Sequence, residues 1–135
     1  MDLNELVDDF SFFDSWEDRY RYLIELGSRL SPLDPGEKIE SNRVRGCISQ
    51  VWVVPSQTQT LPPRLTFRAD SDSAIVKGLV AVAHALLDER TPDEVAAVNV
   101  EEVFGKLGFD AHLSVNRRNG FQSMIETLKR HAAAL

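Results

Sequence analysis

The sequence of 135 residues contains a single cysteine, Cys47. One cysteine excludes an intramolecular disulfide, and within one chain it also excludes a zinc or iron–sulfur site built from several cysteines. No uninterrupted apolar run reaches about 18 residues, so no membrane span is expected. A chain without a disulfide framework suits a reducing compartment, and the acidic N-terminus lacks the basic-then-apolar pattern of a signal peptide. We therefore expect a cytoplasmic protein.

Positive charge is also scarce. The formal net charge is −6, and the lysines and arginines form no run long enough to outweigh it. This balance argues against nucleic acid and anionic membranes as partners. The length fits a single domain, residues 1–135, with one sizeable core. The sequence leaves a monomer and a homodimer equally open.

Cys47 stands in the most informative stretch of the chain. It follows Gly46 and precedes an apolar, β-branched run, residues 51–54, that predicts a strand. Gly46 indicates a turn or a close backbone approach, so Cys47 is expected on a short loop at the entrance of that strand. Arg43 and Arg45 lie nearby in sequence, and positive charge favours the thiolate, which is the nucleophilic form. A lone cysteine is also often a small buried apolar side chain, and both interpretations stay open.

Hydrophobic periodicity predicts several amphipathic helices. Ser15 begins one of them, Gly27 is a plausible stop for it, and Thr91-Pro92 with Glu94 begins another. Gly78 lies on a face of small residues that permits close packing on a neighbour. The predicted helices cover residues 3–13, 16–26, 74–88, 92–98, 100–107 and 118–134, and residues 109–114 are expected to form a loop.

Two strands are predicted between the second and third helices. The first covers residues 50–55, and the second, residues 64–69, alternates apolar and polar side chains, which is typical of an antiparallel strand with one wet face. Residues 42–44 are expected to add a brief edge strand. Helices, a small sheet of about three antiparallel strands and further helices in this order predict an α+β fold.

Four segments carry a resemblance to a known family. They are residues 16–27, the Gly-Cys-Ile-Ser-Gln-Val-Trp segment within 44–52, the Asp-Ser-Asp-Ser-Ala-Ile-Val-Lys-Gly segment within 69–79, and residues 112–120. The chain resembles the SufE family in the order and spacing of these segments, over nearly its whole length. It departs modestly from the family at Val115-Asn116, where many members have a proline.

The resemblance implies a fold like that of the iron–sulfur scaffold protein IscU and a role in sulfur transfer. Cys47 would accept persulfide sulfur from a SufS-like cysteine desulfurase, stimulate that enzyme, and pass the sulfur to an iron–sulfur assembly scaffold. The protein would be a partner of an enzyme rather than an enzyme itself. No cofactor and no metal are implied.

Three further residues are candidates for the site. The resemblance places Arg117 in a loop that approaches Cys47, where a guanidinium group would favour the thiolate or dock the partner; the alternative is an ordinary surface arginine at a helix start. Asp70 either fixes the cysteine loop through hydrogen bonds or caps the helix that follows it. Gln50 is a weaker candidate for bracing the same loop.

The apolar neighbours of Cys47 suggest a resting state. Ile48, Val51 and Trp52 would form an apolar pocket that holds the thiol, raises its pKa and protects it from oxidation. Partner binding would then swing the side chain out.

Two other functions compete with sulfur transfer. A cysteine hydrolase would use Cys47 with His84 or His112 as base, although neither histidine lies in a hydrolase signature and His84 is more simply explained as a packing residue. A pure adaptor would carry an inert cysteine.

Overall fold

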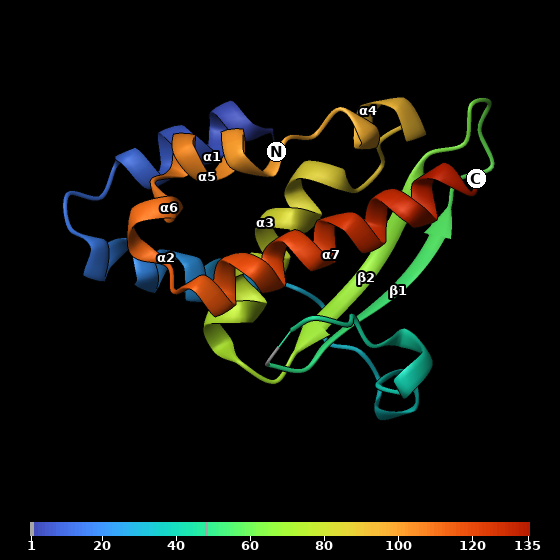
Figure 1. Cartoon of the computed structure of the whole chain (residues 1–135), viewed down its shortest axis with the longest axis horizontal. Coiled ribbons are helices and arrows are strands. Elements are labelled where there is room, and N and C mark those ends of the chain that lie inside the picture. Colours follow the sequence, from blue (N-terminus) through green and yellow to red (C-terminus); the bar gives the residue numbers. More distant parts are fainter. Residues whose placement is uncertain (1, 48) are drawn as a thin grey trace.

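The computed structural model describes residues 2–47 and 49–135 and has an α+β fold, as predicted (Figure 1). Within the described residues a small antiparallel sheet, β1 (Val51–Gln57) and β2 (Leu65–Ser71), packs against helices. The helices are α1 (Leu3–Ser11), α2 (Trp16–Ser28), α3 (Ala74–Leu87), α4 (Pro92–Ala96), α5 (Val100–Leu107), α6 (Phe109–His112) and α7 (Val115–Ala133).

The two strands follow the predicted alternation. Val53 lies opposite Ala69 and Pro55 opposite Phe67, and successive side chains point to opposite faces of a strand. The face of β2 that carries Leu65, Phe67 and Ala69 is buried, while Arg68 on the other face is exposed. The sheet therefore covers the core with one face, as its sequence predicted.

The expected third strand is reduced to a single bridge between Arg43 and Trp52. A 3₁₀ turn, Glu40–Asn42, precedes it, and Gly46 follows it with a φ of 87°, so the chain turns at both ends. Only about one rung of pairing fits between these turns. The prediction of about three strands was therefore wrong by one.

Helix α3 occupies the centre of the molecule, between α2 and the sheet (Figure 1). Its middle turns are buried all round, which is typical of a helix enclosed by other elements. A side chain at Gly78 would place its Cβ 2.4 Å from the carbonyl oxygen of Leu23 in α2, and one at Gly27 would meet the backbone of α3 at 2.7 Å. The predicted close packing at Gly78 is confirmed, but Gly27 lies inside α2 and does not end it.

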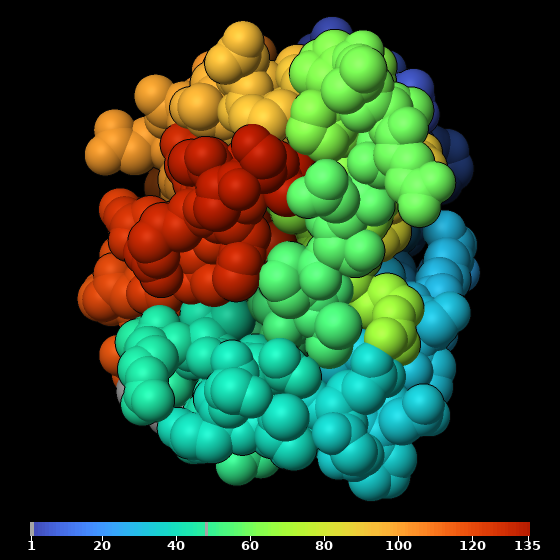
Figure 2. Space-filling model, turned by 90° about the vertical axis from the view of Figure 1, so that its right-hand side faces the viewer, coloured from blue at the N-terminus to red at the C-terminus, as the bar shows by residue number. Residues whose placement is uncertain are grey.

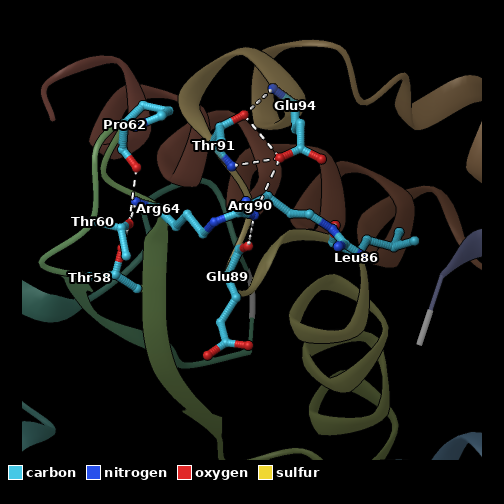
Figure 3. Close-up of polar contacts among 9 residues, drawn as sticks. All are labelled: Thr58, Thr60, Pro62, Arg64, Leu86, Glu89, Arg90, Thr91 and Glu94. Atoms are coloured by element: carbon cyan, nitrogen blue, oxygen red, sulfur yellow. Dashed lines mark hydrogen bonds and ion pairs between the residues drawn. The ribbon is translucent and has the colours of Figure 1, made fainter.

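The far end of the hairpin is fastened to the start of α4 (Figure 3). Arg64 donates to the carbonyl oxygen of Glu89 at 3.0 Å and lies 3.7 Å from the carboxylate of Glu94. The side-chain hydroxyl of Thr91 accepts from the Glu94 N–H, and Glu94 accepts in return from the Thr91 N–H. The predicted capping of this helix by Thr91, Pro92 and Glu94 is confirmed.

The C-terminal third differs from expectation at two boundaries. The expected loop 109–114 contains the short helix α6. Helix α7 starts at Val115, three residues before the predicted start, because the hydroxyl of Ser114 accepts the N–H of Arg117 and caps the helix. Figure 2 shows α7 in red beside β1 in green, with the segment before residue 47 in blue-green across their lower ends. In the described part of the chain, no helix is both long and apolar enough to cross a membrane.

We expect Gly78→Ala to lower the free energy of unfolding by about 1–3 kcal/mol, because the methyl group would overpack the contact between α2 and α3. Gly105→Ala in α5 is the matched control, since outside its own helix turn no atom lies within 4 Å of its Cβ position. There the better helix propensity of alanine should stabilise the protein by about 1 kcal/mol. Urea unfolding measures both. Equal effects of the two substitutions would show that the contact at Gly78 is not close.

Candidate functional site

Cys47 lies at the tip of a short loop that is closed at its base. The N–H of Val44 donates to the carbonyl oxygen of Val51 at 2.8 Å, next to the bridge between Arg43 and Trp52. The chain therefore leaves the sheet after Val44 and returns to it at Val51, the neighbouring position. The predicted place of Cys47, on a loop at the entrance of β1, is confirmed.

The loop rests on two small residues of α7. The thiol of Cys47 donates to the carbonyl oxygen of Gly120 with a sulfur–oxygen distance of 3.4 Å. Beside it, a Cβ at Gly46 would lie 2.7 Å from the hydroxyl oxygen of Ser123. Gly46 was expected to form a turn or a close backbone approach, and with a φ of 87° and this contact it does both. Gly120 and Ser123 together are referred to below as the loop seat.

A cavity of about 380 Å³ opens beside Cys47. It is formed between the cysteine loop, the first turns of α3 and the first turns of α7. Apolar and polar side chains both face it, and its lining consists of Cys47, Ser49, Val51, Val76, Leu79, Ser114, Asn116, Arg117, Gly120, Phe121 and Met124. This volume is within the range of small-molecule sites and far exceeds that of one sulfur atom.

The pocket expected around Cys47 exists in a modified form. Val51 lines the cavity, whereas Trp52 belongs to the opposite face of β1, where the ammonium group of Lys38 lies 5.6 Å from its ring centroid. Ile48, the third expected neighbour, lies outside the described residues. Cys47 itself is half-buried, so its thiol is neither fully enclosed nor freely exposed.

The surroundings of Cys47 make its thiol a weaker acid than that of an ordinary cysteine. Burial raises the pKa of Cys47, and the positive charge of Arg43 lowers it by a smaller amount. Both Arg43 and Arg45 also lie near the carboxylate of Glu40, at 3.8 and 3.4 Å, which offsets part of their charge. At neutral pH the resting thiol is therefore protonated, and it is a poor nucleophile in this position.

Arg117 lines the same cavity as Cys47, although 70 positions separate them in the sequence. It lies in the first turn of α7 and not in a loop, because Ser114 starts the helix earlier than predicted. The side chain is exposed. Its position fits either of the roles considered, a charge close to the sulfur or a contact for a partner.

Asp70 does not cap α3; that expectation was wrong. The hydroxyl of Ser73 caps the helix, and Asp70 is a buried residue of β2 with 2% of its surface exposed. Its carboxylate accepts the N–H of Leu33 at 3.1 Å and lies 3.5 Å from Lys38 and 3.4 Å from Lys77. Asp70 therefore holds the connection of residues 31–42 that leads into the cysteine loop.

Ser71, the last residue of β2, and Asp72, which follows it, brace the cysteine loop. The carboxylate of Asp72 accepts the N–H of Gln50 at 3.0 Å, and the hydroxyl of Ser71 donates to the carbonyl oxygen of Gln50 at 2.7 Å. Gln50 takes part through its backbone. The Asp-Ser-Asp run that precedes α3 was the available signal, but helix caps and loop braces use the same residue types.

The two histidines considered as bases lie elsewhere. His84 packs against Phe67 with ring centroids 5.1 Å apart, and its Nε2 is 3.5 Å from the carboxylate of Asp88. It follows Leu79, the nearer of the two α3 residues that line the cavity, by five residues, or about 7.5 Å along the helix axis. His112 stacks on Trp16 at 3.9 Å. Neither histidine lines the cavity, and the described residues contain no cluster of three or more His, Cys, Asp or Glu that could hold a metal ion.

We expect Asp70→Asn to destabilise the protein by about 3 kcal/mol at pH 7, because it leaves two lysines beside a neutral group. Burial alone would raise the pKa of Asp70, but the N–H groups of Leu33 and Ser71 and the charge of Lys77 outweigh it and lower the pKa. The carboxylate therefore stabilises the fold above about pH 4, and this contribution is lost as the pH falls through its native pKa.

Urea unfolding of wild type and Asp70→Asn at several pH values tests this expectation. The difference between the two should shrink steadily below about pH 4. Asp8→Asn, at an exposed position of α1, should change stability by less than about 0.5 kcal/mol at any pH. A difference between wild type and Asp70→Asn that stays constant down to pH 2 would contradict the role of the ionised carboxylate.

The protonated thiol predicts slow alkylation. In the free protein the rate of reaction of Cys47 with iodoacetamide should keep rising above pH 9, because the pKa of Cys47 is raised. Arg43→Gln should slow the reaction further at each pH, since it removes a charge that lowers this pKa. Arg45→Gln is the matched control and should have a smaller effect. A rate that levels off near pH 8 would show that the pKa of Cys47 is not raised.

The comparisons with known proteins agree with this fold. A family model described as "SufE: Fe-S metabolism associated domain" matches residues 4–132. Two uncharacterized SufE-like proteins are similar over nearly the whole length: one of Rhizobium meliloti is 44% identical, covering 96% of this chain and 94% of the relative, and one of Rhizobium etli is 43% identical, covering 96% and 88%. The solution structure of a hypothetical protein from Thermus thermophilus has a TM-score of 0.77 at 20% identity, over 98% of this chain and 96% of that one, which supports the fold alone. The chain therefore belongs to the SufE family, whose domain is associated with iron–sulfur metabolism.

Proposed function

We propose that the protein is a sulfur carrier that accepts persulfide sulfur from a SufS-like cysteine desulfurase on Cys47. The observation that carries this proposal is the position of the single thiol, at the tip of a loop, half-buried beside a cavity that has room for an added sulfur. Membership of a family associated with iron–sulfur metabolism agrees with it.

The transfer step needs only two sulfurs and the bond between them. The Cys47 thiol first loses its proton to solvent or to a group of the partner. Its thiolate then attacks the terminal, sulfane sulfur of the persulfide on the desulfurase, and the cysteine sulfur of the desulfurase leaves as a thiolate. The products are a persulfide on Cys47 and a free desulfurase thiolate, so no external oxidant or reductant is consumed.

The surroundings of Cys47 suit such a carrier. The chain has no second cysteine that would attack the new persulfide and release sulfide. Arg117 faces the same cavity, where its guanidinium group would stabilise an anionic sulfur or contact the partner. Asp70 acts at a distance, by fixing the connection that leads into the cysteine loop. Downstream, an iron–sulfur assembly scaffold would take the sulfur from Cys47 by a second exchange of the same kind.

The competing functions need features that fit less well. A cysteine hydrolase requires a base within hydrogen-bond reach of the thiol, and neither His84 nor His112 lines the cavity. An adaptor with an inert cysteine has no need for a thiol on a loop tip. Activity that depends on either histidine would favour the hydrolase, and full desulfurase stimulation by Cys47→Ser would favour the adaptor.

Intact-mass spectrometry tests the proposal. The protein is incubated with a cysteine desulfurase and free cysteine, without reductant. We expect a mass increase of one sulfur atom that disappears on treatment with dithiothreitol and is absent from Cys47→Ser. Arg117→Gln should load more slowly, while Arg130→Gln, near the other end of α7, should load like wild type. An unmodified mass in wild type, with the desulfurase turning over cysteine, would refute the proposal.

A further inference from the structure

The contact between Cys47 and α7 leaves room for no more than a methyl group at position 120. An ideal Cβ built on Gly120 would lie 3.4 Å from Sγ of Cys47, and the next nearest atoms are Cβ of Cys47 at 3.9 Å and its Cα at 4.0 Å. Apart from the neighbouring backbone of α7 itself, the three nearest atoms to that position thus all belong to Cys47. The same glycine supplies the carbonyl oxygen that accepts the thiol hydrogen at 3.4 Å.

Helix geometry gives no reason for a glycine at position 120. Gly120 lies in the second turn of α7, a helix of 19 residues, where glycine is less favourable than almost any other residue. Its φ is not positive, in contrast to those of Gly46 and Gly108. The thiol of Cys47 lies against the helix backbone here, in space that any side chain larger than a methyl group would enter.

We propose that Gly120 is a positioning residue for Cys47, and that the size of the residue at this position sets how deeply the thiol rests in its cavity in the free protein. The tip of the loop is held on the loop seat only by the weak hydrogen bond that the Cys47 S–H donates to Gly120 and by close packing. The base of the loop is fixed by stronger hydrogen bonds of its backbone. A larger residue at position 120 displaces the tip of the loop and leaves its base in place.

This inference rests in part on the proposed function, because it assigns a purpose to the resting position of the thiol. A deep position keeps the thiol protonated and shielded, and a shallow one presents it to a partner without further movement. The charged groups near Cys47 are the same whether the loop tip is deep or shallow: Arg43 before the loop, Arg117 on α7, and Asp72 at the loop's end.

The test compares Gly120→Val with Gly105→Val in the free protein. Both substitutions introduce valine into a helix, but at Gly105 no atom lies within 4 Å of the Cβ position. We expect Gly120→Val to raise the rate of alkylation of Cys47 at pH 7.5 by about tenfold, which corresponds to a fall in its pKa of about one unit, and to shift the pH profile of the reaction downwards. Gly105→Val should leave both unchanged. Equal rates for Gly120→Val and wild type, with native circular dichroism, would overturn the proposal.

A double-substitution cycle keeps the test decisive if Gly120→Val folds poorly. If the valine conflicts with Cys47, then combining it with Cys47→Ala should recover most of the lost melting temperature, because the alanine removes Sγ. If the valine disturbs α7 itself, the loss should be the same in both backgrounds, and the proposal fails. Gly120→Ala, whose methyl group would make only an ordinary contact with Sγ, should alkylate at nearly the wild-type rate.

Sulfur loading separates this proposal from the proposed function. With a cysteine desulfurase, Gly120→Val should reach the same maximum of one added sulfur, at a lower half-saturating concentration of desulfurase. If neither wild type nor Gly120→Val takes up sulfur, the proposed function fails, while the alkylation result still decides the role of Gly120. If both load with identical concentration dependence, the resting depth of Cys47 does not limit transfer and the assigned purpose is wrong.

Discussion

The site depends on a difference in hydrogen bonding along the cysteine loop, which is held strongly at its base and weakly at its tip. At the base, Val44 pairs with Val51, and the backbone of Gln50 is bonded by Ser71 and Asp72. Each such bond contributes about 1 kcal/mol, and bonds to a carboxylate contribute more. At the tip, the thiol of Cys47 is a weak donor to a carbonyl oxygen 3.4 Å away. The tip can therefore leave α7 at small cost while the sheet stays intact.

The core provides the rigid surface on which the base of the cysteine loop is fixed. Helix α3 contacts α2, the sheet and α7, and its contact with α2 at Gly78 leaves no room for a side chain. Asp70 fixes the long connection that precedes the loop through buried hydrogen bonds and two lysines. The movement proposed for Cys47 would therefore involve only a few residues around it, without a shift of the helices that line the cavity.

The sequence predicted much of this arrangement because the relevant signals are local. The alternation in residues 65–69 identified β2 and its buried face, and Thr91 with Glu94 marked the start of α4. The expected loop position of Cys47 rested on an adjacent glycine and an adjacent strand. The family resemblance identified Arg117 as a neighbour of Cys47. No local sequence pattern could indicate this, because the two residues are 70 positions apart.

What the sequence did not predict depends on contacts between distant segments. The sequence around Gly27 is typical of a helix end. In the structure Gly27 instead packs against the backbone of α3, which leaves no room for a side chain. Asp70 fitted a helix cap equally well, and only the burial of its carboxylate under residues 33–38 decides the matter. The role of Gly120 has no local signal at all, because a glycine inside a helix is simply unfavourable until the position of Cys47, 73 residues away, is known.

A sulfur carrier and a cysteine hydrolase differ in whether the thiol must be activated in the free protein. A hydrolase must activate its nucleophile for each substrate molecule that diffuses in, so its base lies beside the thiol permanently. A carrier meets its donor as a protein surface, and that surface can supply the missing charge or draw the loop outwards when it docks. Between such encounters a protonated, half-buried thiol is less exposed to oxidation, because the thiolate is the form that oxidises. The raised pKa of Cys47, which would handicap a hydrolase, is thus consistent with a cysteine that must react with one partner and with little else.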